Sequence, residues 1–147
     1  MTEMVANLYD QDFYAWLREN AERIRQGRFS EVDVEHIAEE LECMGRSEKR
    51  AFINRFAVLL AHLLKWQFQP IKRSMSWKYT IEEQRRKVQQ LLQDSPSLGY
   101  ELDDKLADAY EIAILKAAKE TQVDKMSFPR NCPFSFEQAM NDAFWPE

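Results

Sequence analysis

The chain has 147 residues and a net charge of −5, with 45% hydrophobic and 31% charged residues. This composition is typical of one globular domain and excludes a disordered chain, a collagen-like repeat and a disulfide-stapled miniprotein. The chain has only three glycines, and because hairpin turns use glycine, this number favours an all-α fold over an all-β fold.

Charge is distributed unevenly along the chain. Residues 1–45 carry four basic and eleven acidic side chains, residues 46–90 carry eleven and three, and residues 91–147 carry five and eleven. The middle third is therefore a basic island. It predicts either a patch for an anionic partner or a pairing with the acidic segments.

Apolar periodicity predicts a single bundle over residues 1–147, with about five long helices and a short C-terminal helix. The first helix is expected to begin at a cap on Asp10 and to end before Gly27. One of its faces is apolar, with aromatic anchors for burial: Phe13, Trp16, Leu17, Ala21 and Ile24.

The second helix is expected to run from a cap at Ser30 to a stop at Gly45. Phe29 before the cap and Val34 after it have the spacing of a hydrophobic staple. Its apolar side consists of Val34, Ile37, Leu41 and Met44, and the rest of its surface is strongly acidic.

The third helix, capped by Ser47, is apolar nearly all round from Phe52 to Leu64. This pattern predicts a central helix covered on several sides. We expect Phe56, Leu60 and Leu63 to be buried.

Pro70 ends that helix, and residues 71–76 are expected to form a connector. A fourth helix follows, with Trp77, Ile81, Val88, Leu91 and Leu92 facing inward. Ser95 before Pro96 predicts the start of the fifth helix, whose apolar positions are Leu102, Leu106, Ala109, Tyr110, Ala113 and Ala117.

The C-terminal region combines loop, cap and aromatic signals. Pro129 and Pro133 indicate a loop, and Ser135 with Gln138 has the spacing of a capping box for a short helix. We expect the closing residues 144–146, Phe-Trp-Pro, to dock onto the bundle.

Three features of the sequence bear on the cellular compartment: the N-terminal residues, the longest apolar run and the cysteines. Residues 1–10 lack the pattern of a secretory signal, and the longest uncharged apolar run, residues 56–64, is too short for the ~20 residues of a membrane span. Cys43 and Cys132 follow no CxxC spacing. We expect a cytoplasmic protein with two free thiols, no membrane contact, no metal and no cofactor.

Several motifs in order carry a family resemblance: Leu8-Tyr9, Asp12-Phe13, Trp16-Leu17, residues 39–42 and 44–47, residues 62–67, Ser76-Trp77, Thr80-Ile81, Gln84-Arg85, residues 96–98 and residues 144–146. Over about residues 8–147 the chain resembles a family common in cyanobacteria, domain of unknown function family twenty-nine. The resemblance implies an all-helical cytosolic domain and no known activity. Gly99-Tyr100 departs from the family's pattern.

Two sets of residues are candidates for chemistry. His36 lies among carboxylates at helical spacing, but the second half of a bundle metal motif is missing, which favours a solvated acidic helix. Arg55 and His62 lie seven residues apart, which is similar to the Arg-x(4–6)-His motif of HEPN ribonucleases. A hydrogen-bonded core histidine and a surface arginine are the favoured interpretation.

Cations and aromatic rings alternate between residues 65 and 87. The candidate binding residues are Lys65, Trp66, Lys72, Arg73, Lys78, Arg85 and Arg86. Cations and stacking rings are what single-stranded nucleic-acid binding requires, but the acidic chain as a whole favours protein pairing or self-association. The sequence therefore predicts an interaction protein that uses the connector, with a nucleic-acid-associated protein, such as a HEPN-like ribonuclease using Arg55 and His62, as the alternative.

Overall fold

The computed structural model describes residues 8–147. The prediction that residues 1–10 form no secretory signal falls mostly on residues 1–7, which lie outside the described residues. Within residues 8–147 the secondary structure is helical without a strand, which confirms the all-α prediction. The chain divides into two compact units at Ser47, and each is described by itself. A single domain over residues 1–147 stays a prediction.

The first unit holds α2 (Phe13–Arg25), the 3-10 helix η1 (Phe29–Glu31) and the beginning of α3 (Val34–Phe68). The expected cap at Asp10 is wrong by two residues. Asp12 caps α2, because its carboxylate accepts a hydrogen bond from the N–H of Ala15 at 3.0 Å. The helix does end before Gly27, which has a φ of 73° that suits glycine at a helix C-terminus.

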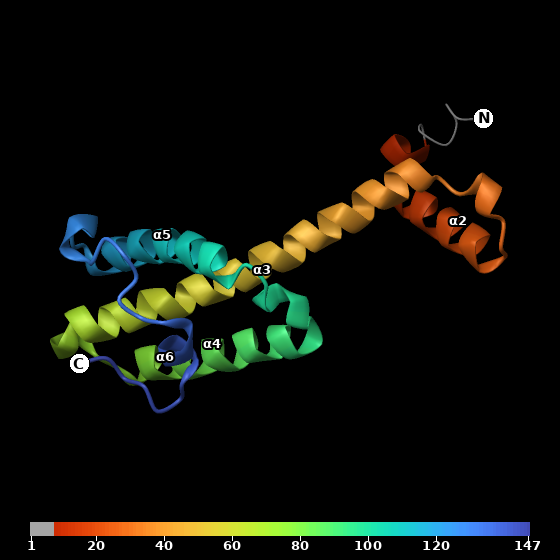
Figure 1. Ribbon diagram of the computed structural model, residues 1–147. Coiled ribbons are helices and arrows are strands. Elements are labelled where there is room, and N and C mark those ends of the chain that lie inside the picture. Colours follow the sequence, from red (N-terminus) through yellow and green to blue (C-terminus); the bar gives the residue numbers. More distant parts are fainter. Residues whose placement is uncertain (1–7) are drawn as a thin grey trace. The chain divides into compact units, whose positions relative to one another are not determined.

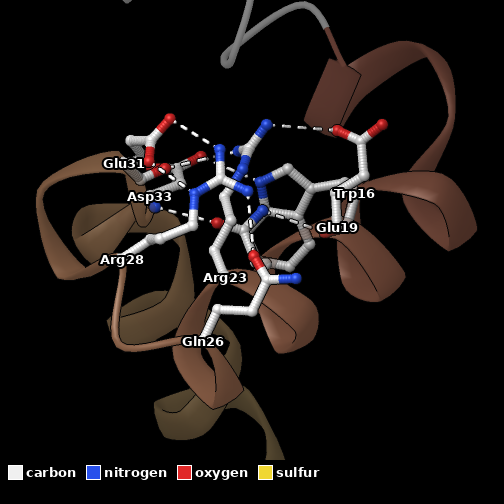
Figure 2. Close-up of polar contacts among 8 residues, drawn as sticks. Trp16, Glu19, Arg23, Gln26, Arg28, Glu31 and Asp33 are labelled. Atoms are coloured by element: carbon white, nitrogen blue, oxygen red, sulfur yellow. Dashed lines mark hydrogen bonds and ion pairs between the residues drawn. The ribbon is translucent and has the colours of Figure 1, made fainter.

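A chain of hydrogen bonds ties α2 to the start of α3 (Figure 2). The buried Trp16 indole donates to the Asp33 carboxylate at 2.9 Å, and the Asn20 side chain accepts from the Asp33 backbone N–H at 2.9 Å. Tyr9, which precedes α2, donates its hydroxyl to Glu40 on α3. The first half of α2 is thus tied to the start of α3.

The second and third predicted helices are one continuous helix, so the predicted boundary at Gly45 and Ser47 is wrong. Gly45 has strong helix formers on both sides and no proline nearby, and in that setting one glycine costs only about 1 kcal/mol. The helix therefore continues through it.

The predicted start of the second helix is also wrong. Ser30 lies inside η1, and Asp33 takes the cap position by accepting a hydrogen bond from the His36 N–H at 3.4 Å. The hydrophobic staple does not form, since Phe29 is 67% and Val34 66% exposed. The interaction between Asp33 and Trp16 sets the start of α3 instead.

Much of the first unit's apolar surface stays exposed. On α2 the buried side chains are Trp16 and Asn20, so one aromatic anchor is confirmed. The exposed apolar side chains of the unit are Phe13, Tyr14, Leu17, Ile24, Phe29, Val34, Leu41 and Met44.

The second unit is built around the second half of α3. Contacts from α3 to α4 (Met75–Asp94) and to α5 (Leu102–Thr121) place it between them, as Figure 1 also shows. Phe56, Leu60 and Leu63 are at most 1% exposed, which confirms that this half of α3 is central.

The fifth helix begins later than predicted. Pro96 starts a short 3-10 helix, η3 (Pro96–Gly99), because proline suits a first turn, and α5 begins only at Leu102. Between them Glu101 has a φ of 51°. The ammonium of Lys105 closes the break by donating to the carbonyls of Leu98 and Tyr100, each at 2.7 Å.

The C-terminal region forms as predicted. After η4 (Lys125–Ser127), Ser135 and Gln138 form the capping box of α6 (Phe136–Met140). The last residues pack against the core of the second unit, with the rings of Trp66 and Trp145 4.8 Å apart. Docking of residues 144–146 is therefore confirmed.

Candidate functional site

The connector between α3 and α4 contains a 3-10 helix, η2 (Pro70–Lys72). Pro70 ends α3 because it cannot donate a backbone hydrogen bond, and it then occupies the first position of η2. Ser74 caps α4 by accepting from the N–H of Trp77 at 3.2 Å. Two helix ends and a proline therefore fix the backbone of the connector.

Apolar side chains project from this connector into solvent. Ile71 is 98% exposed, and Met75 and Tyr79 are 57% and 56% exposed. Phe68, Lys72 and Lys78 lie beside them in the sequence; Lys72 is exposed and Lys78 is half-buried. We name these six residues the connector surface: Phe68, Ile71, Lys72, Met75, Lys78 and Tyr79.

Lys65 is not part of that surface, since it is only 3% exposed. Its ammonium pairs with the carboxylate of Glu120 on α5 and lies 4.9 Å from the centre of the Trp77 ring on α4. It therefore joins three helices inside the second unit. Burial raises the pKa of the Glu120 carboxyl, but the hydrogen bond and charge of Lys65, together with the nearby charges of His62 and Lys116, outweigh burial and lower the pKa overall.

Arg73 and Trp66 hold the C-terminal segment. The guanidinium of Arg73 donates to the carbonyl of Trp66 at 2.7 Å and to that of Pro146 at 3.3 Å. It also lies over the Trp66 ring, 5.0 Å from its centre, while Trp145 packs on the same ring. The Trp66 ring is thus engaged within the molecule.

Arg85 is the most deeply buried arginine described, at 2% exposure. Its Nε and Nη2 donate to the carbonyls of Ala139 and Phe144, both at 2.7 Å, and its guanidinium lies 5.3 Å from the Trp145 ring centre. These carbonyls are at the end of α6 and beyond it, where no backbone N–H satisfies them. Arg85 therefore fastens the C-terminal segment to α4.

The candidate binding residues thus separate into two groups. Lys65, Trp66, Arg73 and Arg85 make contacts inside the second unit, whereas Lys72, Lys78 and Arg86 lie at or near the surface. Sequence reasoning missed the exposure of Ile71 and the arginine contacts with the C-terminal segment. Alternating cations and rings cannot show which cation meets a backbone carbonyl far along the chain.

Among the described residues, no hydrogen bond joins Arg55 to His62. Arg55 is exposed, whereas both ring nitrogens of His62 are engaged: Nδ1 with the Val58 carbonyl at 2.9 Å and Nε2 with the Lys65 ammonium at 3.3 Å. Burial lowers the pKa of His62, with the nearby Lys65 charge acting in the same direction. The neutral ring that results suits a structural hydrogen bond.

His36 lies in the first unit, where its Nδ1 contacts the Asp33 carboxylate at 2.7 Å and its ring stacks on Tyr9. The hydrogen bond to Asp33 raises the pKa of His36. Over residues 8–147, no group of three or more His, Cys, Asp or Glu side chains is placed to hold a metal ion. The two side chains thus form a hydrogen-bonded pair beside the Tyr9 ring.

Comparisons with known proteins give one match. A family model described as "Domain of unknown function DUF29" matches residues 8–145. No curated protein and no solved structure matches the chain. In the part of the chain that the structure describes, no helix combines the length and apolar character needed to cross a membrane.

Proposed function

The chain belongs to the DUF29 family, and because that description assigns no activity, we propose a function from the connector surface. The protein is an interaction module that binds an apolar, acidic segment of a partner protein. The motif resemblance and the family model agree over nearly the whole chain. The family is therefore shown, and the activity is what we propose.

One observation carries this proposal, the 98% exposure of Ile71. Burying an isoleucine side chain stabilises a complex by about 1.5–3 kcal/mol relative to leaving it in water. Ile71 sits on a backbone held by Pro70 and by two helix ends, so little conformational entropy is lost when a partner covers it. Met75 and Tyr79, four residues apart on α4, add two more exposed apolar side chains.

Charge indicates the chemistry of the partner. Residues 49–81 contain no Asp or Glu, and Lys72 and Lys78 flank the exposed apolar side chains of the connector surface. An acidic partner is attracted by these lysines during approach, while the apolar contact supplies most of the affinity. A partner segment with alternating apolar and acidic side chains fits both features.

The engaged rings favour a protein over a nucleic acid. Single-stranded nucleic-acid binding needs aromatic faces free for base stacking. The Trp66 ring is occupied by Arg73 and Trp145, and the Trp77 ring by Lys65. The exposed cations left beside Tyr79 are too few for a groove that follows a phosphate backbone.

We propose that the interaction takes place in the cytoplasm. Cys43 and Cys132 are both free thiols, which supports a reducing compartment.

The test uses the full chain and a displayed peptide library as the probe. Selection is expected to enrich peptides that combine apolar and acidic side chains, and a labelled copy is then titrated by fluorescence anisotropy. Ile71→Asp should raise the Kd at least tenfold, or about 1.4 kcal/mol. Tyr100→Asp is the matched control, because Tyr100 is also exposed, at 71%, but lies outside the connector surface.

Two results would overturn the proposal. In the first, Ile71→Asp and Tyr100→Asp bind the selected peptides equally well. In the second, a labelled single-stranded RNA of mixed sequence binds the wild type and is lost on Lys72→Glu, which favours a nucleic-acid function. Cleavage of that RNA, abolished by His62→Gln, would favour the HEPN-like alternative.

A further inference from the structure

An open groove lies in the second unit, between α5 and the segment of residues 125–130 that follows it. Its volume is about 680 Å³, which is within the range of about 300–1,000 Å³ that ligand pockets cover. Leu115 on α5 and Met126 in η4 line the groove and are 59% and 83% exposed. Phe128, at 5% exposure, adds a nearly buried ring to the lining. The groove therefore presents apolar side chains to solvent.

The backbone of residues 125–130 is fixed near both ends. Asp124 caps η4 by accepting a hydrogen bond from the Met126 N–H at 2.8 Å. Farther along, the hydroxyl of Tyr110 on α5 donates to the Pro129 carbonyl at 2.5 Å. A wall held in this way loses little conformational entropy when a ligand binds. The unbranched Met126 side chain adapts readily to the shape of a ligand.

The groove is continuous with the connector surface. Phe68, which is 38% exposed and belongs to the connector surface, contacts the Phe128 ring edge to face, with the ring centres 5.7 Å apart. The ion pair between Lys65 and Glu120 sets the end of α3 beside the end of α5. Figure 1 shows both helix ends at the same end of the second unit, together with the beginning of α4. The two surfaces thus share a boundary at Phe68 and Phe128.

The charge of the groove resembles that of the connector surface. The charged side chains in its lining, all exposed, are Lys125, Arg130 and Glu111. Because Tyr110 is bonded to Pro129, the next residues on the two segments, Glu111 and Arg130, lie at the same end of the groove and offset each other's charge. Lys125 precedes Met126 at the other end of the segment. That end is therefore basic and apolar, as the connector surface is.

We propose that the groove is the second half of one binding site, into which the partner segment on the connector surface continues across the ring contact. This inference rests on the proposed function and specifies the partner as an acidic segment with two apolar anchors. The first anchor covers Ile71. The second packs between Leu115 and Met126, and a carboxylate beside it pairs with Lys125.

Linking the two anchors raises affinity without a further contact. Once the first anchor is bound, the second meets the groove at a local concentration on the order of millimolar. Each surface alone therefore binds weakly. The intact segment should bind about 100-fold more tightly than either half, which is at the lower end of the gain that linkage gives.

Methyl NMR of the full chain, isotope-labelled at its methionine methyl groups, tests this site with a peptide selected from the displayed library as the probe. Met75 reports on the connector surface and Met126 on the groove, while Met44 in the first unit is the control. The peptide should shift the signals of Met75 and Met126 and leave that of Met44 unchanged. Leucine substitution at each position assigns the signals.

Substitution then measures what each half contributes. Met126→Asp should raise the Kd of the selected peptide at least tenfold, as Ile71→Asp does. Met44→Asp is the matched control, because Met44 is also exposed, at 63%, but lies in the other unit. Cutting the peptide between its two apolar side chains should give one half that responds only to Ile71→Asp and another that responds only to Met126→Asp.

The outcomes separate this inference from the function on which it rests. If Ile71→Asp weakens binding and Met126→Asp does not, the groove is not part of the site and the proposed function stands. If Met126→Asp alone weakens binding, the groove holds a separate ligand and both proposals are wrong. If neither substitution changes the Kd, both proposals are wrong as well.

Discussion

At the scale of single residues, Arg85 shows how a basic side chain in a basic segment can be structural. It is 2% exposed and satisfies two carbonyls of the C-terminal segment. Its neighbour Arg86 is exposed and follows it directly in the sequence. No sequence pattern distinguishes the two, since the difference depends on α6 and on residue 144.

This contrast predicts unequal effects on stability. Arg85→Met keeps most of the side-chain volume but leaves two buried carbonyls without donors, so it should reduce the free energy of unfolding by about 3 kcal/mol. Arg86→Met should change it by less than about 0.5 kcal/mol. Urea denaturation followed by circular dichroism measures both values. Equal effects would contradict the role given to Arg85.

The two histidines are expected to titrate on opposite sides of 6.5. The hydrogen bond to Asp33 raises the pKa of His36, and burial lowers the pKa of His62. Carbon-bound ring protons followed by NMR across pH give both values, and His36→Gln assigns them. Asp33→Asn should return the pKa of His36 toward 6.5 without moving that of His62.

These shifts have opposite consequences for stability. His36 stabilises the fold fully below pH 6.5, and this contribution is lost as pH rises through its raised pKa in the folded protein. The contribution of His62 is present above pH 6.5 and is lost as pH falls through its lowered pKa in the folded protein.

At the scale of elements, α3 shows where glycine patterns are ambiguous. Gly27 and Gly45 both follow an apolar periodic segment, yet Gly27 ends its helix and Gly45 does not. The difference is in backbone conformation, since Gly27 has a φ of 73° whereas Gly45 lies within α3. By contrast, Pro70 and the Ser135 cap were predicted correctly because their effects are local.

Alanine substitution at these glycines should therefore have opposite signs. Gly45→Ala should stabilise the protein by about 0.5–1 kcal/mol, because an added Cβ meets no atom within 4 Å and alanine favours the helix. Gly27→Ala should destabilise it by about 1 kcal/mol, since alanine disfavours a positive φ. Thermal melts of the two variants provide the comparison, and a stabilised Gly27→Ala would contradict the assigned turn.

The centre of the second unit gives a third comparison. Phe56 is 1% exposed and its ring lies 5.5 Å from that of Phe136. Phe56→Ala should cost about 3–5 kcal/mol, because it removes buried contacts and leaves a cavity. Asn54→Ala, on the exposed side of the same helix, should change stability by less than about 1 kcal/mol. Chemical denaturation measures both, and a small effect at Phe56 would mean that α3 is not central.

At the scale of the whole molecule, burial is concentrated in the second unit. The core cluster lies entirely within residues 52–139, whereas α2 buries only Trp16 and Asn20. Composition and periodicity predicted the helical class and this core. They could not predict that the apolar positions of α2 and early α3 stay exposed, because periodicity shows a face and not what covers it.

Protection from hydrogen exchange should differ along α3 itself. Amides of residues 36–46 should exchange faster than those of residues 52–64, because only the latter lie in the buried core. Mass spectrometry of peptides after exchange in deuterated water measures this at low protein concentration. Uniform protection along the helix would contradict the difference.

The arginine contacts to the C-terminal segment also bear on how the protein is made. A growing chain on the ribosome exposes Trp66 and Arg85 long before residues 139–146 have been translated. Until then the guanidinium of Arg85 lacks its two carbonyl acceptors and the Trp66 ring lacks its contact with Trp145. The second unit therefore completes these contacts only after residues 139–146 have left the exit tunnel.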